Sequence, residues 1–164
     1  MKETASQQAI HGLGHSSASS LIEGSSSSSE WLTARPGELF CIRVSAASTG
    51  GAYSMTEIVS MPGDSTPLHV HNKEDEYAIV LEGVAQIVYG TQVIHAETGT
   101  SISLKRGIPH GWGNPTDKPI RLLMIASPGG CEEALRIIAR GGLTDFQAVA
   151  EQFHITLVGP PVLS

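Results

Sequence analysis

Residues 62–83 read PGDSTPLHVHNKEDEYAIVLEG, and this stretch decides the fold. It places His69 and His71 two residues apart, and Glu76 follows five residues after His71. Residues i and i+2 of a β-strand point to the same side, so both imidazoles can converge on one point, where a carboxylate from the neighbouring strand can meet them. Two imidazoles and a carboxylate suit a divalent first-row transition metal. The alternative is a pair of histidines on a solvated strand edge, since an H-x-H motif alone is weak.

A second stretch, GTSISLKRGIPHGWGN at residues 99–114, supplies a third histidine. Ser101–Leu104 predicts a short strand, and the tight corner Arg106–Pro109 delivers His110 to the start of another strand. Short strands at regular spacing, separated by glycine and proline turns, are typical of a β-sandwich or a β-barrel. The pattern therefore favours an all-β fold that places several histidines on short strands.

The remaining elements follow from alternation and turn residues. We expect further strands at Leu39–Val44, Tyr53–Val59, Glu76–Leu81, Val84–Tyr89, Gln92–Ala96 and Ile120–Ser127. We expect one helix at Cys131–Arg140, which Gly141 ends, and a second that opens at a capping box, Thr144-x-x-Gln147, and runs to about Phe153.

Composition points to one β-rich domain and excludes several partners. The chain has 164 residues, 40% of them hydrophobic, and its 18 glycines suit a fold with many turns. A net charge of −6 without a basic cluster argues against a nucleic-acid partner, and no apolar run approaches the roughly 18 residues of a membrane span. The N-terminus lacks the apolar segment of a secretory signal, and Cys41 and Cys131 have no C-x-x-C spacing. We therefore expect reduced thiols and a cytoplasmic protein.

Residues 1–30 have a different composition from the rest of the chain. Serine tracts at Ser16–Ser20 and Ser25–Ser29 leave too little apolar surface to offset the entropy of ordering. We expect a flexible segment here, followed by a single domain over residues 31–164.

Together the two histidine stretches resemble the paired signatures of the cupin superfamily. The first is Gly63, five residues, His69, one, His71, four, Glu76, six, Gly83; the second is Gly99, a spacer, Gly107, two, His110, three, Asn114. Lys105 stands where cupins usually carry proline, which affects the corner and not the ligands. The motif region covers roughly Tyr53–Ala126, and the flanking segments resemble single-domain bacterial cupins related to quercetin dioxygenases.

The resemblance implies a fold and a site. The fold is all-β, a double-stranded β-helix (jelly-roll) barrel, here with two short C-terminal helices. The site is one divalent transition metal (Fe, Mn, Ni, Co, Cu or Zn) bound by His69, His71, Glu76 and His110. In quercetinase-like cupins the counterpart of Glu76 also acts as a base, which makes Glu76 the candidate catalytic residue.

Three nearby residues are candidates for an apolar substrate pocket. Trp112 has the same strand parity as His110, and Tyr53 and Met55 lie on an alternating strand. Plain core packing is the alternative for each of them. Glu57 shares the face of Tyr53 and Met55, where it would be either a second acid–base group or half of a surface ion pair.

Three classes of function remain open. The favoured one is a metal-dependent oxygenase (dioxygenase) of a small enolic or aromatic oxygenated substrate. The others are a redox-neutral isomerase, lyase or cyclase that uses the same metal, and a non-catalytic cupin that binds a small molecule. The absence of an evident effector domain favours an enzyme. We also expect a homodimer, since sheet edges are usually paired or covered, with the region Trp31–Val44 at the interface.

Overall fold

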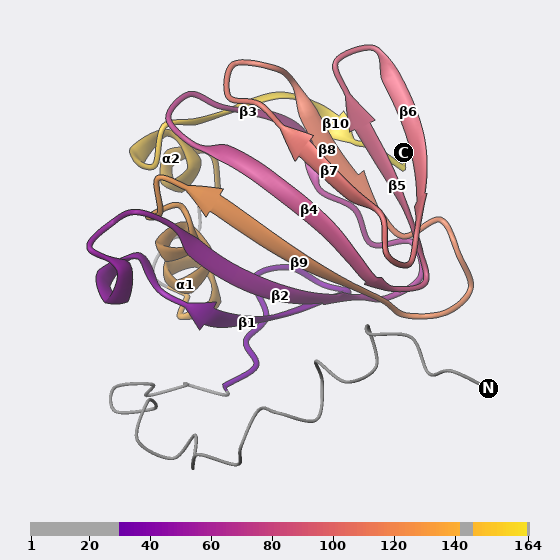
Figure 1. Ribbon diagram of the computed structural model, residues 1–164, viewed down its shortest axis with the longest axis horizontal. Coiled ribbons are helices and arrows are strands. Elements are labelled where there is room, and N and C mark those ends of the chain that lie inside the picture. Colours follow the sequence, from indigo (N-terminus) through magenta and orange to yellow (C-terminus); the bar gives the residue numbers. More distant parts are fainter. Residues whose placement is uncertain (1–29, 142–145, 164) are drawn as a thin grey trace, which may run out of the picture.

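The computed structural model describes residues 30–141 and 146–163, and it shows two five-stranded antiparallel sheets that face each other (Figure 1). The first sheet has the order β1 (Glu38–Val44), β2 (Ser54–Ser60), β9 (Ile120–Ser127), β4 (Asp75–Glu82) and β7 (Ser101–Leu104). The second has the order β10 (Ile155–Pro161), β3 (Pro67–His71), β8 (His110–Gly113), β5 (Val84–Tyr89) and β6 (Gln92–Glu97). The helices are the 3-10 turn η2 (Ala46–Thr49), α1 (Glu132–Ala139) and α2 (Phe146–Gln152). The predicted jelly-roll barrel with two short C-terminal helices is confirmed.

The chain crosses repeatedly from one sheet to the other. Strands β3 and β4 follow each other in sequence but lie in different sheets, and β5 returns to the second sheet. Strand β9 pairs with both β2 and β4, so a late segment of the chain lies between two earlier ones in the first sheet. Residues far apart in sequence therefore face one another across a shared interior.

Side-chain alternation fills that interior. In β9 the side chains of Ile120, Leu122 and Met124 are buried, whereas Arg121 between them is exposed. The same alternation in the other strands builds one core between the sheets, made of Phe40, Ile42, Ile58, Ala78, Val80, Ala85, Ile87, Ala96, Leu104, Trp112, Ile120, Leu122 and Met124.

Two motif residues that bind no metal hold turns in place. Gly83 has a φ of 83°, in the left-handed region, and a Cβ there would lie 2.6 Å from Cγ2 of Ile120. Asn114 is fully buried, and its side-chain amide donates hydrogen bonds to the carbonyls of Ser60 (2.9 Å) and Lys118 (2.7 Å). Both residues therefore fix how the loops join the strands.

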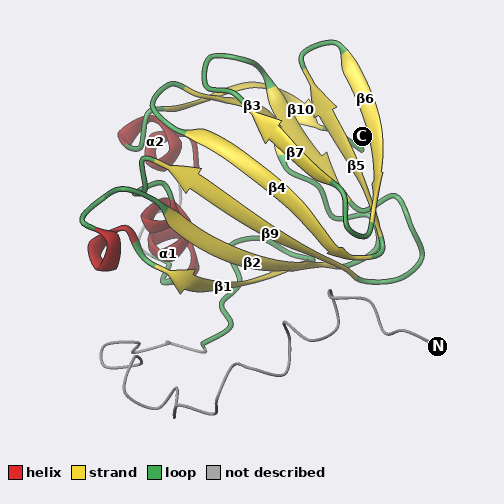
Figure 2. Ribbon diagram, viewed as in Figure 1, coloured by secondary structure: helices red, strands yellow, loops and turns green. Residues whose placement is uncertain are grey.

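The two helices lie at one end of the barrel, beside the start of β4 and the end of β9 (Figure 2). The buried carboxylate of Glu132 accepts hydrogen bonds from the backbone N–H groups of Ala46 and Gly130, both 2.8 Å long, and so ties α1 to η2. The predicted helix Cys131–Arg140 is confirmed within a residue at each end. The predicted cap Thr144 and residues 1–29 lie outside the described residues.

Strand β10 was not predicted. It pairs antiparallel with β3, although its sequence ITLVGPP ends in two prolines. Proline is tolerated there because β10 is the edge strand of its sheet, and the pairing is irregular between Leu157 and Pro161. Strand β1, in the region expected at a dimer interface, pairs with β2 of its own chain. Among the described residues no helix is both long and apolar enough to cross a membrane.

Candidate metal centre

Three histidines meet on the inner face of the second sheet. His69 on β3 lies directly opposite His110 on β8, and His71 follows two residues along β3. The ring centroids of His69 and His110 are 4.8 Å apart, and those of His69 and His71 are 5.2 Å apart. The same-face prediction for the H-x-H pair therefore holds, and cross-strand pairing adds the third imidazole.

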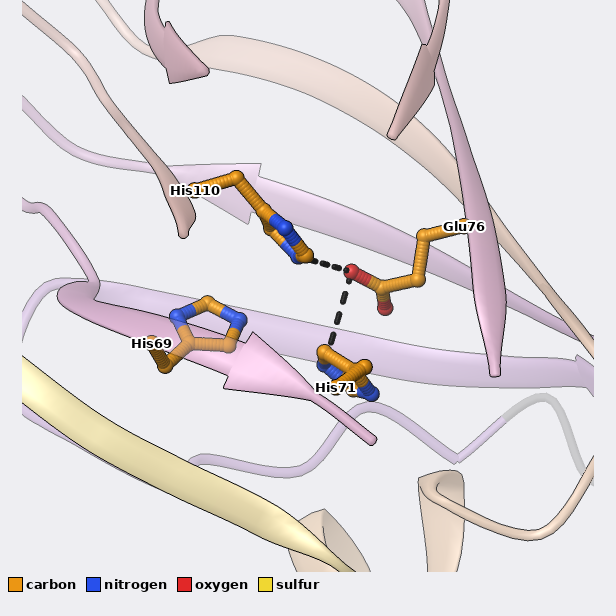
Figure 3. Close-up of side chains that lie close together, drawn as sticks. All are labelled: His69, His71, Glu76 and His110. Atoms are coloured by element: carbon orange, nitrogen blue, oxygen red, sulfur yellow. Dashed lines mark hydrogen bonds and ion pairs between the residues drawn. The ribbon is translucent and has the colours of Figure 1, made fainter. Parts of the chain in front are cut away.

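The carboxylate comes from the opposite sheet. Glu76 lies on β4 and reaches across the barrel interior to the histidines (Figure 3). Its Oε2 is 3.1 Å from Nε2 of His110 and 3.5 Å from Nε2 of His71. The expectation of a carboxylate on the neighbouring strand was wrong, because the five-residue spacing spans the crossing from one sheet to the other.

The second nitrogen of each imidazole is already engaged. Nδ1 of His69 lies 2.8 Å from the carbonyl oxygen of Pro67, and Nδ1 of His110 lies 2.9 Å from that of Ile108. A carbonyl oxygen only accepts, so both Nδ1 atoms carry a proton, and Nε2 is the atom of each ring that a metal would take. In the metal-free chain, Nε2 of His110 lies 3.1 Å from Oε2 of Glu76. Hydrogen bonds of this kind, made by the nitrogen that faces away from the metal, hold metal-binding histidines in orientation.

The third histidine is held by a carboxylate that the sequence reasoning missed. Nδ1 of His71 lies 3.3 Å from Oε2 of Glu74, whose side chain is almost fully buried. A carboxylate behind an imidazole raises the basicity of the ligating nitrogen. Its sequence signal is a second acidic residue in the short loop that links the two ligand strands.

Burial and mutual charge set the protonation of the cluster. Burial would raise the pKa of Glu76, but the charge of His71 and the hydrogen bond of His110 outweigh it and lower that pKa to about 2. Burial lowers the pKa of His69 to about 4, and its two histidine neighbours add to the shift. Burial by itself would lower the pKa of His71, but the negative charges of Glu76 and Glu74 outweigh it and raise that pKa. Glu76 is thus ionised and His69 neutral at pH 7, as metal ligation requires.

The ligand set fits a divalent transition metal. One ligand atom from each of His69, His71, Glu76 and His110 lies within 4.8 Å of the others, so the four could hold one ion between them. Imidazole nitrogens with one carboxylate suit iron, manganese, cobalt, nickel, copper or zinc and do not select among them.

A cavity of about 120 Å³ lies beside the cluster. His69, His71 and Glu76 line it, and so do apolar side chains from both layers of the barrel and from the helices. The apolar lining residues include Ile58, Trp112, Met124, Ala126, Leu135 and Ile138. The cluster is therefore reached through a largely apolar chamber, the usual character of a small-molecule site.

Of the three predicted pocket residues, the structure brings one to this cavity. Trp112 lines it, whereas Tyr53 is 41% exposed and Met55 lies on the outer face of the first sheet. The residues of β2 that line the cavity, Ser54, Thr56 and Ile58, alternate with Met55. Apolar residues occur on both faces of this strand, so its sequence did not reveal which face points inward.

Other acidic and thiol groups are now placed. Glu57 lies on the outer face and accepts hydrogen bonds from Arg43 and Arg121, so it is a surface ion pair and not an acid–base group of the site. Cys131 lines the cavity, and burial, with Glu76 next in importance, raises the pKa of its thiol. Cys41 and Cys131 form no disulfide.

The sequence comparison agrees with this geometry. Residues 56–126 match the Cupin domain family. The xanthan biosynthesis protein XanB of Xanthomonas campestris is 27% identical over 78 residues, which span 48% of this chain and only 17% of XanB. This chain therefore corresponds to a minor part of that curated relative.

Solved structures share the fold at low sequence identity. KdgF from Halomonas sp. superposes with a TM-score of 0.58 and 14% identity, over 63% of this chain and 90% of KdgF. The polyketide cyclase RemF from Streptomyces resistomycificus gives 0.51 and 24%, over 56% and 66%. A cupin-superfamily sugar phosphate isomerase from Silicibacter pomeroyi gives 0.51 and 21%, over 57% and 61%. The match of residues 56–126 to the Cupin domain family thus agrees with the double-stranded β-helix fold that this chain shares with these structures.

Proposed function

We propose that this protein is a metal-dependent enzyme whose small substrate chelates the metal through neighbouring oxygen atoms, as an enediol, an enolate or a catechol does, and that the reaction consumes dioxygen. The observation that carries the proposal is the cluster of His69, His71, Glu76 and His110, of which the first three line an apolar cavity. An oriented set of ligand atoms beside a chamber for an organic molecule is the arrangement that such catalysis needs.

When bound, a divalent metal would lower the pKa of a chelated hydroxyl and offer positions for substrate oxygens beside the four protein ligands. The chain itself supplies the base. Glu76 is ionised at pH 7, and its side chain is 11% exposed in the cavity wall. Its low pKa makes it a weak base in the metal-free chain, so it would accept a proton only from a substrate group whose own pKa the bound metal has lowered.

The other residues position and shield. The carbonyls of Pro67 and Ile108 and the carboxylate of Glu74 prevent the imidazoles from turning. Apolar side chains such as Trp112 and Met124 exclude water from the chamber and give a flat substrate a surface to pack on. An apolar chamber also suits dioxygen, which is itself apolar, and this supports an oxygenase.

A redox-neutral isomerase, lyase or cyclase is the second candidate. RemF is a polyketide cyclase, and the Silicibacter pomeroyi protein is a sugar phosphate isomerase. Such reactions use the same chelation and the same proton transfer to Glu76 without an oxidant. The two candidates therefore differ in one measurable quantity, the consumption of dioxygen.

The test is turnover with and without oxygen. Metal-loaded protein is given flavonols, catechols and 1,3-diketones in an oxygen electrode and again under strict anaerobiosis. Glu76→Gln should abolish most turnover, and Glu97→Gln, a change at an exposed glutamate on β6, should not. Oxygen uptake that matches substrate loss supports the oxygenase. Undiminished turnover without oxygen would contradict the oxygenase and favour the isomerase, lyase or cyclase. If no member of the panel binds the metal-loaded protein, the chelation function itself fails.

A further inference from the structure

A second charged group lies in the cavity wall, away from the metal ligands. Arg35 donates two hydrogen bonds to Asp64, from Nε to Oδ1 (2.8 Å) and from Nη2 to Oδ2 (3.2 Å), and its Nη1 contacts Oε2 of Glu38. The side chains of Glu38 and Asp64 are only 1% and 2% exposed. Both Arg35 and Glu38 line the cavity that His69 also lines.

The charges in this group do not balance. One guanidinium faces two buried carboxyl groups. Asp64 accepts most of the hydrogen bonds: both of those that Arg35 donates to it and a third from Oγ of Ser60 (2.7 Å). Glu38 keeps a single contact, and its Oε1 is buried without a hydrogen-bond partner among the described residues. Burial raises the pKa of Glu38 to about 7, with Arg35 opposing this and Asp64 adding to it. A buried polar atom without a partner is costly, and native proteins rarely leave one.

A purely structural role does not account for that oxygen. The bond pair between Arg35 and Asp64 already ties the segment before β1 to the turn after β2. Glu38 also shares its inward parity with Phe40 and Ile42, two core residues, so an apolar side chain would suit the position at lower cost. A carboxyl group kept there with one free oxygen is explained if something in the cavity completes its hydrogen bonding.

Trp112 connects this group to the metal ligands. The guanidinium carbon of Arg35 lies 5.0 Å from the centre of the Trp112 ring, and Trp112 is two residues from His110 on β8. In the first sheet, Glu76 and Ser54 both pair with Ala126, at one end of β2. Glu38 pairs with Ser60, at the opposite end of β2. The cavity thus has the histidine cluster toward one end, Glu38 toward the other, and the indole between them.

We infer that Glu38, held by Arg35, is a second binding subsite, which takes a hydroxyl group at the end of the substrate remote from the metal. This rests on the proposed function, since the metal is what fixes the other end. The substrate class then becomes narrower: chelating oxygens at one end, a flat apolar middle over Trp112, and a hydroxyl at the far end. Arg35 is a positioning residue in this scheme, and Glu38 determines specificity.

The experiment compares matched ligands on the cobalt-loaded protein. Benzoylacetone is a 1,3-diketone with a flat phenyl ring, and its para-hydroxyl and para-(2-hydroxyethyl) analogues add a remote hydroxyl at two lengths. Dissociation constants are measured by calorimetry for the wild type and for Glu38→Leu, Glu38→Gln and Glu57→Leu. The last variant is the control, because Glu57 is also bound by arginines but lies on the outer face. Thermal unfolding verifies that each variant folds.

The wild type should bind at least one hydroxyl analogue about tenfold more tightly than benzoylacetone, the value of one hydrogen bond to a carboxyl group. Glu38→Leu should lose this preference, Glu38→Gln should keep part of it, and Glu57→Leu should keep all of it. Equal affinities for all three diketones in the wild type, or a preference that survives in Glu38→Leu, would overturn the subsite while leaving the metal chemistry intact. Failure of every diketone to bind would overturn the proposed function, and this inference with it.

Discussion

Replacing Glu38 by glutamine should change how stability depends on pH. The pKa of Glu38 rises from 4.5 to about 7 in the folded protein, so the folded state binds its proton more tightly than the unfolded state does. The resulting stabilisation is complete below pH 4.5 and is lost as the pH rises through 7. At 1.36 kcal/mol per pKa unit, a shift of about 2.5 units corresponds to about 3 kcal/mol. Glutamine does not titrate, so the variant lacks this loss.

The assay is urea unfolding between pH 4.5 and pH 8, followed by tryptophan fluorescence. The free energy of unfolding of the wild type minus that of Glu38→Gln should fall by about 3 kcal/mol over this window. The other titrating groups contribute equally to both proteins, so the subtraction removes their effect. Among them are Arg35 and Asp64, the charged neighbours of Glu38. Glu97→Gln, at an exposed position, should give a flat difference. A Glu38→Gln difference that stays constant within about 0.5 kcal/mol would refute the burial argument.

Three further predictions concern the carboxylate behind His71, a turn and the assembly. Glu74→Gln should weaken metal binding roughly 10- to 100-fold, because the carboxylate behind His71 is lost; chelator competition measures this, and unchanged affinity would contradict the role. Gly83→Ala should destabilise the fold by about 3 kcal/mol in urea unfolding, since the new Cβ strains a left-handed residue and meets Ile120; a cost below about 1 kcal/mol would speak against this. Light scattering should give a homodimer of 17.2 kDa chains, because β1 is an edge strand of the first sheet and sheet edges are usually paired or covered; a monomer at micromolar concentration would exclude it.

The short strands and the same-face pair of histidines could be predicted from local rules, whereas the jelly-roll topology and the four-ligand set were implied by the resemblance to cupins. Strand parity places His69 and His71 on one face whatever the tertiary structure is, and glycine and proline turns mark the strand ends. Sequence spacing does not tell which sheet a strand joins, so Glu76 was expected beside β3 and lies across the barrel from it. Strand β10 was missed because its prolines are tolerated only at an edge, which is a property of the assembled sheet.

The cavity was less predictable than the metal ligands. Strand β2 has apolar side chains on both faces, so the parity that excludes Met55 from the cavity and admits Ile58 could not be read from it. Glu38 did leave a signal, a carboxylate in phase with the buried Phe40, but its meaning depends on Asp64, 26 residues further along the chain. Charge balance among buried groups is a tertiary property.

The most direct test of the account is the metal content of the purified protein. Elemental analysis should find about one divalent transition-metal ion per chain, and anomalous scattering should place it between the four ligand side chains. The double variant His69→Ala, His110→Ala should lose most of the metal, because it removes two facing ligands. His95→Ala, at an exposed histidine on β6, should keep it. Full metal occupancy in the double variant would contradict the assignment.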